Sequence, residues 1–219
     1  MTGPHPDPEP GAGGDLGPLL QAAREELAEV NAAREAGLTA CRRTIRAAGS
    51  AIRALHRLDP ERAARFTADS EAAVREAQAA LRPFPAVAYA GFLHDAEKEY
   101  AEAVLTRALI DGTPLPDHRG LDVGLPAWLN GLAEAASELR RHLLDRLRRD
   151  ETAKAETLLS AMEDVYEALV GVDFPDAVTG GLRRSADALR AVLERTRSDV
   201  TTTMIQLRLR DALERARPT

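Results

Sequence analysis

Residues 15–57 read DLGPLLQAAREELAEVNAAREAGLTACRRTIRAAGSAIRALHR, and this stretch decides the fold class. Apolar residues recur in it at helical spacing and no proline follows Pro18, which predicts one long amphipathic helix. These apolar residues are Leu19, Leu20, Ala23, Leu27, Val30, Ala33, Leu38, Ile45, Ile52 and Leu55. Aromatic residues make up only 4% of the chain, and few segments alternate apolar with polar residues. The sequence therefore predicts an all-α protein.

The rest of the chain divides into further helices. Asp59 and Pro60 form a favourable helix start, and a second helix is predicted to end at Leu81. Further helices are predicted over residues 86–110, 127–149 and 150–170, and from Ala177 or past Gly181 to residue 215, with a proline-rich loop over residues 113–126. Short breaks between long helices favour a single-domain antiparallel helical bundle of about six to seven helices, with long first and last helices.

Composition sets the domain and compartment expectations. Residues 1–14 are rich in proline and glycine and are predicted to be a disordered tail, so the helical domain is assigned to residues 15–219. Cys41 is the single cysteine and cannot form an intramolecular disulfide; no secretory signal or membrane-length apolar run is seen. We therefore expect a cytoplasmic protein without a membrane partner. Thin, alanine-rich apolar stripes on the long helices favour a homo-oligomer.

Two pairs of glutamates stand at helical spacing. Glu99 and Glu102 project from one face of the third predicted helix, and Glu134 and Glu138 do so on the fourth. If these helices pack face to face, the carboxylates converge and Mg²⁺ or Mn²⁺ would relieve their repulsion. The ordinary alternative is that each glutamate lies on a solvated helix face. A ferritin-like di-iron site needs Glu-x-x-His pairs, which are missing. Glu138 and His142 are four residues apart and not three, so His142 is predicted to be a polar surface residue or an interface hydrogen-bonder and not a ligand.

Arginines offer local positive charge although the formal net charge is −6. Arg42, Arg46, Arg53 and Arg57 fall near one face of the first helix, with Arg43 beside them. Arg183 and Arg184, and also Arg140 and Arg141, are further candidates for phosphate contacts. In a chain this rich in arginine and glutamate, ion pairs and solvated helix faces are the alternative reading.

Several short motifs occur in a fixed order along the chain. They are CRRTIR at 41–46, LHR at 55–57, KEYAEA at 98–103, LNGLAEAASELRR at 129–141, MEDVYE at 162–167, DFPD at 173–176, GLRR at 181–184 and ERTRSD at 194–199. Each motif alone is weak, but the ordered set resembles the family of translin and translin-associated factor X (Trax), over roughly residue 42 to the end. Within this family, the sequence most resembles the prokaryotic translin-like proteins.

The resemblance implies a function and a site. It implies binding of single-stranded RNA, with single-stranded DNA as a further partner, and Mg²⁺-dependent endoribonuclease activity in a closed oligomer, plausibly an octamer. Trax-type catalytic acids correspond to Glu99, Glu102 and Glu134, although Trax has an aspartate at the third position, and Glu138 is assigned a supporting role at the metal. Two alternatives stay open: a non-catalytic binder of single-stranded RNA or DNA, and a helical scaffold that binds only proteins.

Overall fold

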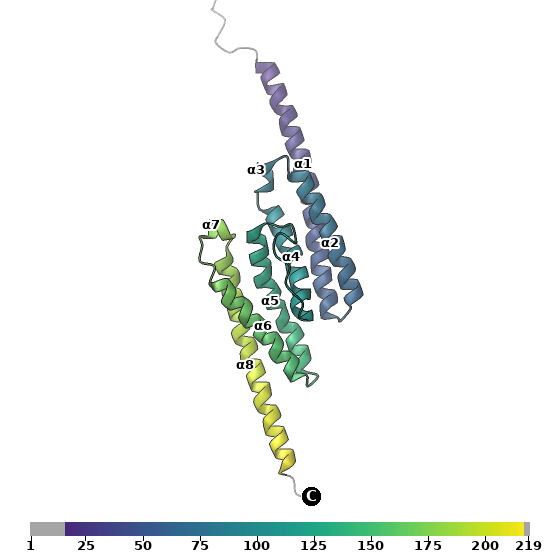
Figure 1. The fold of residues 1–219 in the computed structure, drawn as a ribbon. Helices are drawn as coiled ribbons and strands as arrows, with labels where there is room; N and C mark the ends of the chain where they lie inside the picture. The colour runs from purple at the N-terminus through teal and green to yellow at the C-terminus, as the bar shows by residue number, and fades with distance from the viewer. Residues whose placement is uncertain (1–15, 217–219) are drawn as a thin grey trace, which may run out of the picture.

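The computed structural model describes residues 16–216, which form eight helices and no strand (Figure 1). The helices are α1 (Leu16–His56), α2 (Pro60–Leu81), α3 (Pro85–Ala88), α4 (Phe92–Asp111), α5 (Leu125–Leu147), α6 (Thr152–Val170), α7 (Asp176–Thr179) and α8 (Leu182–Arg215). The all-α prediction is confirmed, and the six long helices correspond to the six that the sequence predicts.

Helices α1 and α2 form an antiparallel hairpin with an alanine-rich interface. The hairpin turns at Asp59, whose side chain accepts a hydrogen bond from the backbone N–H of Arg62 and so caps α2. Fully buried alanines on both helices, together with Gly37, allow the two backbones to approach closely. A Cβ at residue 37 would lie 2.7 Å from Cδ2 of Leu81, so this glycine makes room for the leucine.

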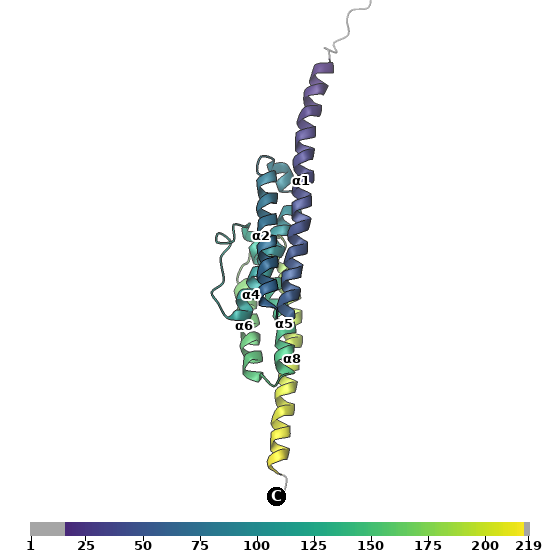
Figure 2. The ribbon, with the colours of Figure 1, turned by 90° about the vertical axis from the view of Figure 1, so that its right-hand side faces the viewer.

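The remaining long helices pack beside this hairpin, with α5 at the centre. Helix α4 lies between α1 and α5, and α6 and α8 cover the other side of α5 (Figure 1). The largest core cluster includes Leu105 of α4, Leu132 of α5 and Leu189 of α8. The purple end of α1 and the yellow end of α8 project beyond the bundle at opposite ends (Figures 1 and 2). Central packing brings α4 and α5 into contact along their lengths.

The structure differs from the sequence prediction at one helix start, and of the two predicted starts of the last helix it bears out the one past Gly181. The helix predicted over residues 86–110 is interrupted, because Gly91 has a φ of 101° that a right-handed helix does not allow, so α3 and α4 are separate. At the last helix, Gly180 and Gly181 both have positive φ and divide the short α7 from α8. The count of eight exceeds the predicted six to seven because of α3 and α7, each of four residues.

Other expectations concern the chain ends and the membrane. The tail predicted over residues 1–14 lies outside the described residues, and the assignment of one domain to residues 15–219 stays a prediction. Among residues 16–216, no helix combines the length and hydropathy needed to span a membrane.

Candidate metal centre

Three glutamates meet where α4 packs against α5. Glu99, Glu102 and Glu134 each contribute one carboxylate oxygen to a group whose atoms all lie within 4.8 Å of one another. Glu102 is buried, with 7% of its surface exposed, while Glu99 and Glu134 are partly exposed. The i, i+3 spacing presents the first two acids on one face of α4, and the contact with α5 adds the third. The cluster is therefore open to solvent on one side.

Burial and local charge together shift the pKa of two of these acids. Burial, reinforced by the nearby carboxylates of Glu134, Glu99 and Glu138, raises the pKa of Glu102 to about 8. Burial also raises the pKa of Glu99, partly opposed by the ammonium of Lys98. The Glu102 carboxyl consequently holds a proton at neutral pH, and the cluster carries more negative charge than it can accommodate when fully ionised.

Lys98 supplies the only ammonium that the described residues bring to the cluster. Its Nζ lies 2.7 Å from each carboxylate oxygen of Glu134 and 3.5 Å from Oε1 of Glu99. Burial disfavours the charged lysine, but the hydrogen bonds and charge of Glu134 outweigh it, and the pKa of Lys98 is raised. The sequence analysis did not single out this residue, although its place beside Glu99 in KEYAEA was visible.

The fourth predicted ligand, Glu138, is held by a different partner. Its Oε2 lies 2.6 Å from Nε2 of His56, and it is not part of the group of three acids. The His56 side chain is 4% exposed and comes from the last turn of α1, so this contact ties α1 to α5. The surface alternative for His142 was wrong: it is buried on α5, where it is hydrogen-bonded to Arg146, whose Nη2 lies 2.9 Å from its Nε2.

The donor set fits a hard divalent cation. Carboxylate oxygens are the ligands that Mg²⁺ and Mn²⁺ prefer. Oxygens bound to one ion at about 2.0–2.6 Å lie at most about 5 Å apart, and the three glutamate oxygens satisfy that limit. The raised pKa of Glu102 agrees with this fit. Burial and nearby carboxylates disfavour its ionised form, and a bound cation would favour that form. Glu99, Glu102 and Glu134 can thus hold such an ion without rearrangement of the helices.

The predicted arginines of α1 lie along hollows between α1 and α2. Arg43 and Arg46 line one hollow of about 390 Å³, and Arg53 and Arg57 line the next, of about 190 Å³. Both hollows include Phe66, and Arg42 is exposed on the same helix. Arg43 is less available than predicted, because its Nη1 donates to both carboxylate oxygens of Glu76 at 3.0 and 2.9 Å.

Helix α2 adds two basic residues that the sequence analysis missed. The guanidinium groups of Arg62 and Arg65 lie 5.5 and 5.4 Å from the ring centre of Phe66, which is a cation–π arrangement. Their spacing around Phe66 is visible in ERAARF, but only the hairpin brings Arg62 and Phe66 into one hollow with Arg53 and Arg57. Asp69 lines the first hollow and Asp59 the second, but guanidinium groups outnumber these carboxylates, and their combination with an aromatic ring suits a nucleic-acid strand.

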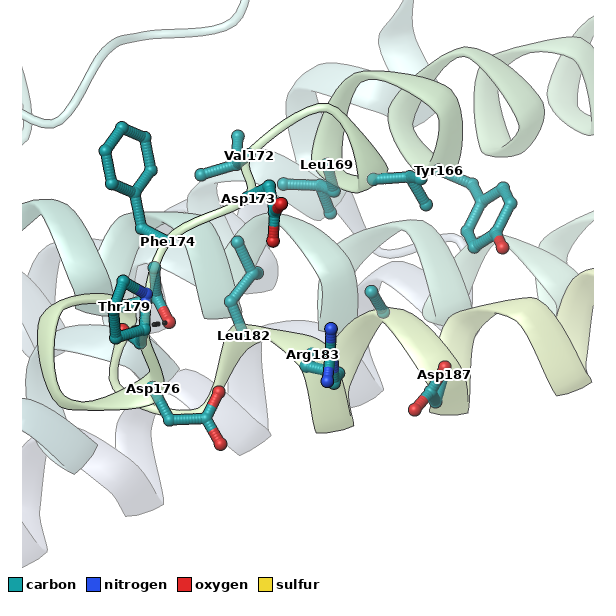
Figure 3. Close-up of a pocket in the computed structure, with 13 residues that line it drawn as sticks. Tyr166, Leu169, Val172, Asp173, Phe174, Asp176, Thr179, Leu182, Arg183 and Asp187 are labelled. Atoms are coloured by element: carbon teal, nitrogen blue, oxygen red, sulfur yellow. Dashed lines mark hydrogen bonds between the residues drawn. The ribbon is translucent and has the colours of Figure 1, made fainter.

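Arg183 and Arg184 lie elsewhere, at the start of α8. Arg183 lines a pocket of about 740 Å³ together with Asp173, Asp176 and Asp187 (Figure 3). Three carboxylates around one guanidinium give this pocket a negative balance, which disfavours phosphate. Because α4 and α5 separate the first turn of α8 from α1 in Figure 1, the arginines predicted on α1 and those predicted on α8 form two groups and not one surface.

A third basic hollow adjoins the acidic cluster. It has a volume of about 670 Å³, and Glu138 and His56 line it together with Arg140, Arg141 and Arg148. Arg140 is anchored, because it donates to Asp199 at 2.7 Å and to Thr196 at 3.1 Å. Asp145 also lines this hollow, and its Oδ1 accepts from Nη1 of Arg148 at 3.4 Å. The exposed Arg141 and the paired Arg148 place positive charge beside Glu138, whose carboxylate adds to the effect of burial in raising the pKa of Glu102.

Fold and site together define a class: an all-α bundle with a carboxylate cluster between two central helices and basic hollows around it. Comparison with known proteins gives the family. No protein-family model matches the chain. An uncharacterized protein of Methanocaldococcus jannaschii is 30% identical over 190 residues, which cover 86% of this chain and 84% of the relative. The chain belongs to the translin family, as the similarity to C3PO (translin–Trax) structures establishes.

Solved structures similar to this chain include those of C3PO proteins. AfC3PO, solved both by itself and in complex with duplex RNA, is 32% identical with a TM-score of 0.79. The match to the RNA complex covers 86% of this chain and 97% of that chain. NeC3PO, solved in its apo form, has a TM-score of 0.78 at 18% identity, with 87% and 100% of the two chains covered, and shares the fold.

Proposed function

We propose that this protein binds single-stranded RNA and cleaves it internally in a reaction that depends on Mg²⁺ or Mn²⁺. The observation that carries the proposal is the meeting of Glu99, Glu102 and Glu134 within 4.8 Å. Similarity to AfC3PO, which was solved with duplex RNA, supports RNA as the partner. The ligand and catalytic roles of these residues follow the family resemblance.

In this proposal, different residues of the chain hold the metal ion, accept a proton and bind the RNA. A divalent ion at the cluster would compensate phosphodiester charge and lower the pKa of a water molecule. Glu99, Glu102 and Glu134 would hold it, and an ionised carboxylate of the cluster would accept the proton of the attacking water. Arg141 and Arg148 in the adjoining hollow would contact phosphates close to the scissile bond, and the α1–α2 surface would bind the strand further away.

We further propose that the protein acts as a homo-oligomer, as its long helices suggest. Leu19, Leu20 and Leu27 on α1 and Leu209 and Leu213 on α8 are each more than half exposed. Both sets lie on helix ends that project from the bundle (Figure 1). A second copy of the chain would cover these leucines. In a closed assembly, which we propose to be an octamer, every copy would bury the same leucines.

One observation favours a second candidate, a non-catalytic binder of single-stranded RNA or DNA. Lys98 already compensates the charge of Glu134, so the cluster has an intrachain counter-ion without any metal. In this second candidate, the glutamates stabilise the α4–α5 contact, and the arginine surfaces alone bind the nucleic acid.

Cleavage assays distinguish the two candidates. Labelled single-stranded RNA and duplex RNA are incubated with the protein and Mg²⁺ or EDTA, beside a Glu99→Gln, Glu102→Gln double variant. A matched control is Glu156→Gln, which changes an exposed helix glutamate on α6. We expect internal cleavage of single strands that requires Mg²⁺, is abolished in the double variant and persists in the control. Salt-sensitive binding without cleavage would contradict the nuclease and support the binder.

A further inference from the structure

We propose that Lys98 is the resident counter-cation of the carboxylate cluster, and that a divalent ion binds by displacing its ammonium from Glu134. The inference rests on the metal-binding half of the proposed function and adds the step that controls access to the site. Its basis is the position of Nζ, 2.7 Å from both oxygens of Glu134 and 3.5 Å from Glu99.

Charge repulsion disfavours two cations at Glu134. An ammonium has three donors, and here two are directed at Glu134 while the third side faces Glu99. A metal ion bound about 2.1 Å from an oxygen of Glu134 would lie within about 5 Å of Nζ. Like charges at that separation repel strongly where water is partly excluded, and Lys98 is only 19% exposed. The ammonium must therefore leave before the ion can use this carboxylate.

The residue type suits a displaceable counter-ion. Lys98 and Lys154 are the two lysines of the chain, and every other basic side chain of the 29 lysines and arginines is an arginine. An arginine at position 98 would bind Glu134 through two parallel N–H bonds of a rigid fork. Lysine presents a compact charge on a flexible stem, so it can move away from Glu134 toward the solvent-exposed side of the cluster.

Displacement has a consequence for ion selectivity. Without a divalent ion, Lys98 keeps α4 and α5 together by compensating Glu134 and Glu99. A monovalent ion offers no more charge than the ammonium that it would replace, whereas Mg²⁺ or Mn²⁺ offers twice as much. We therefore expect the site to bind divalent ions in preference to monovalent ones.

Two substitutions at residue 98 should act in opposite directions. Lys98→Met removes the competing charge at similar length, and Lys98→Arg strengthens it. Measured as free Mn²⁺ by electron paramagnetic resonance, Mn²⁺ affinity should rise about tenfold in Lys98→Met and fall by a similar factor in Lys98→Arg. Lys154→Met, at a lysine that is 65% exposed and pairs with Glu151, should leave the affinity unchanged. Equal or weaker binding in Lys98→Met would overturn the inference.

The unaltered protein provides a second measurement, which holds even if a variant folds poorly. Reductive ¹³C-methylation labels the amino groups, and the two lysine signals are assigned with the Lys154→Met protein. Lys98 should react slowly in EDTA and several times faster in Mg²⁺, while Lys154 reacts equally in both. A methylation rate of Lys98 that is the same in EDTA and in saturating Mg²⁺ would contradict displacement.

Failure of this inference and failure of the proposed nuclease activity would give different experimental results. Magnesium-dependent cleavage with unchanged affinity in both Lys98 variants would overturn this inference alone. The predicted affinity changes without any RNA cleavage would overturn the nuclease alone and leave Lys98 as the counter-ion. Absence of Mn²⁺ binding in the unaltered protein and in every variant would overturn both.

Discussion

Gly131 of α5 lies against the α4 backbone at Glu102: a Cβ at residue 131 would be 3.1 Å from the backbone nitrogen of Glu102 and 2.8 Å from the carbonyl oxygen of Lys98. The helices can approach this closely only because residue 131 has no side chain. One turn further along α5, the same approach brings Glu134 to the acids of α4. The glycine in LNGLAE is therefore a requirement of the cluster.

Gly131→Ala should separate α4 from α5 and weaken the site. Crowding is expected to cost about 1–3 kcal/mol of unfolding free energy, partly offset by about 1 kcal/mol from the better helix propensity of alanine. We also expect Mn²⁺ affinity to fall about tenfold, because the glutamate oxygens move apart. Gly49→Ala on α1 is the control, since its Cβ would meet only the flexible end of Arg53. Equal Mn²⁺ affinity in both variants would argue against this account.

Stability without metal should depend on pH through Glu102. The pKa of this carboxyl is about 8 in the folded protein, against an ordinary value of 4.5, so the unfolded chain loses the proton first as pH rises. The folded state consequently loses stability from about pH 4.5 to pH 8, on the order of 3 kcal/mol by pH 7. Glu102→Gln should remove much of this slope and raise the melting temperature at pH 7 in EDTA. Parallel melting profiles of the variant and the unaltered protein would exclude the explanation.

Metal binding should release a proton below pH 8. The ionised form of Glu102 is the one that can bind a cation, so apparent Mn²⁺ affinity is expected to rise about tenfold per pH unit from pH 6 to pH 8 and then level off. Calorimetry in two buffers of different ionisation enthalpy counts the released protons at pH 7, and about one is expected. An affinity that is constant over this range would contradict a role for Glu102 as a ligand.

The α1–α2 arginines should contribute to RNA binding through phosphate contacts. Arg53→Gln with Arg57→Gln should weaken binding of single-stranded RNA, and each lost contact should reduce the slope of log affinity against log salt by about 0.7. An Arg195→Gln, Arg208→Gln variant changes two exposed arginines of α8 and should keep the slope. Filter binding at several salt concentrations measures both. An unchanged slope in the α1 variant would place the RNA on another surface.

The projecting end of α8 should be needed for assembly. Ile205, Leu209 and Leu213 are spaced by four residues and are all more than half exposed, so they form one stripe. Leu209→Glu with Leu213→Glu should give a smaller species in light scattering after gel filtration, while the helical circular dichroism of each chain is retained. Asp211→Lys, which changes an exposed residue on the opposite face of α8, is the control. An unchanged mass in the leucine variant would show that this stripe is not an interface.

The sequence by itself determined the helices and the face on which each acid lies. Helical periodicity places Glu99 beside Glu102, and breaks at Pro60, Gly112 and the glycines before α8 set most helix ends, because both effects are local. The start of α4 was missed, since the conformation of Gly91 depends on how the chain enters the bundle.

Only the tertiary structure decided which helices meet and which side chains pair. It joined α4 to α5 so that Glu134 completes the cluster, directed Lys98 to Glu134, and linked Glu138 to His56 across 82 positions of the chain. It also divided the predicted arginines among three surfaces. Such contacts depend on packing between segments distant in sequence, and helical spacing carries no information about a residue's partner on another helix.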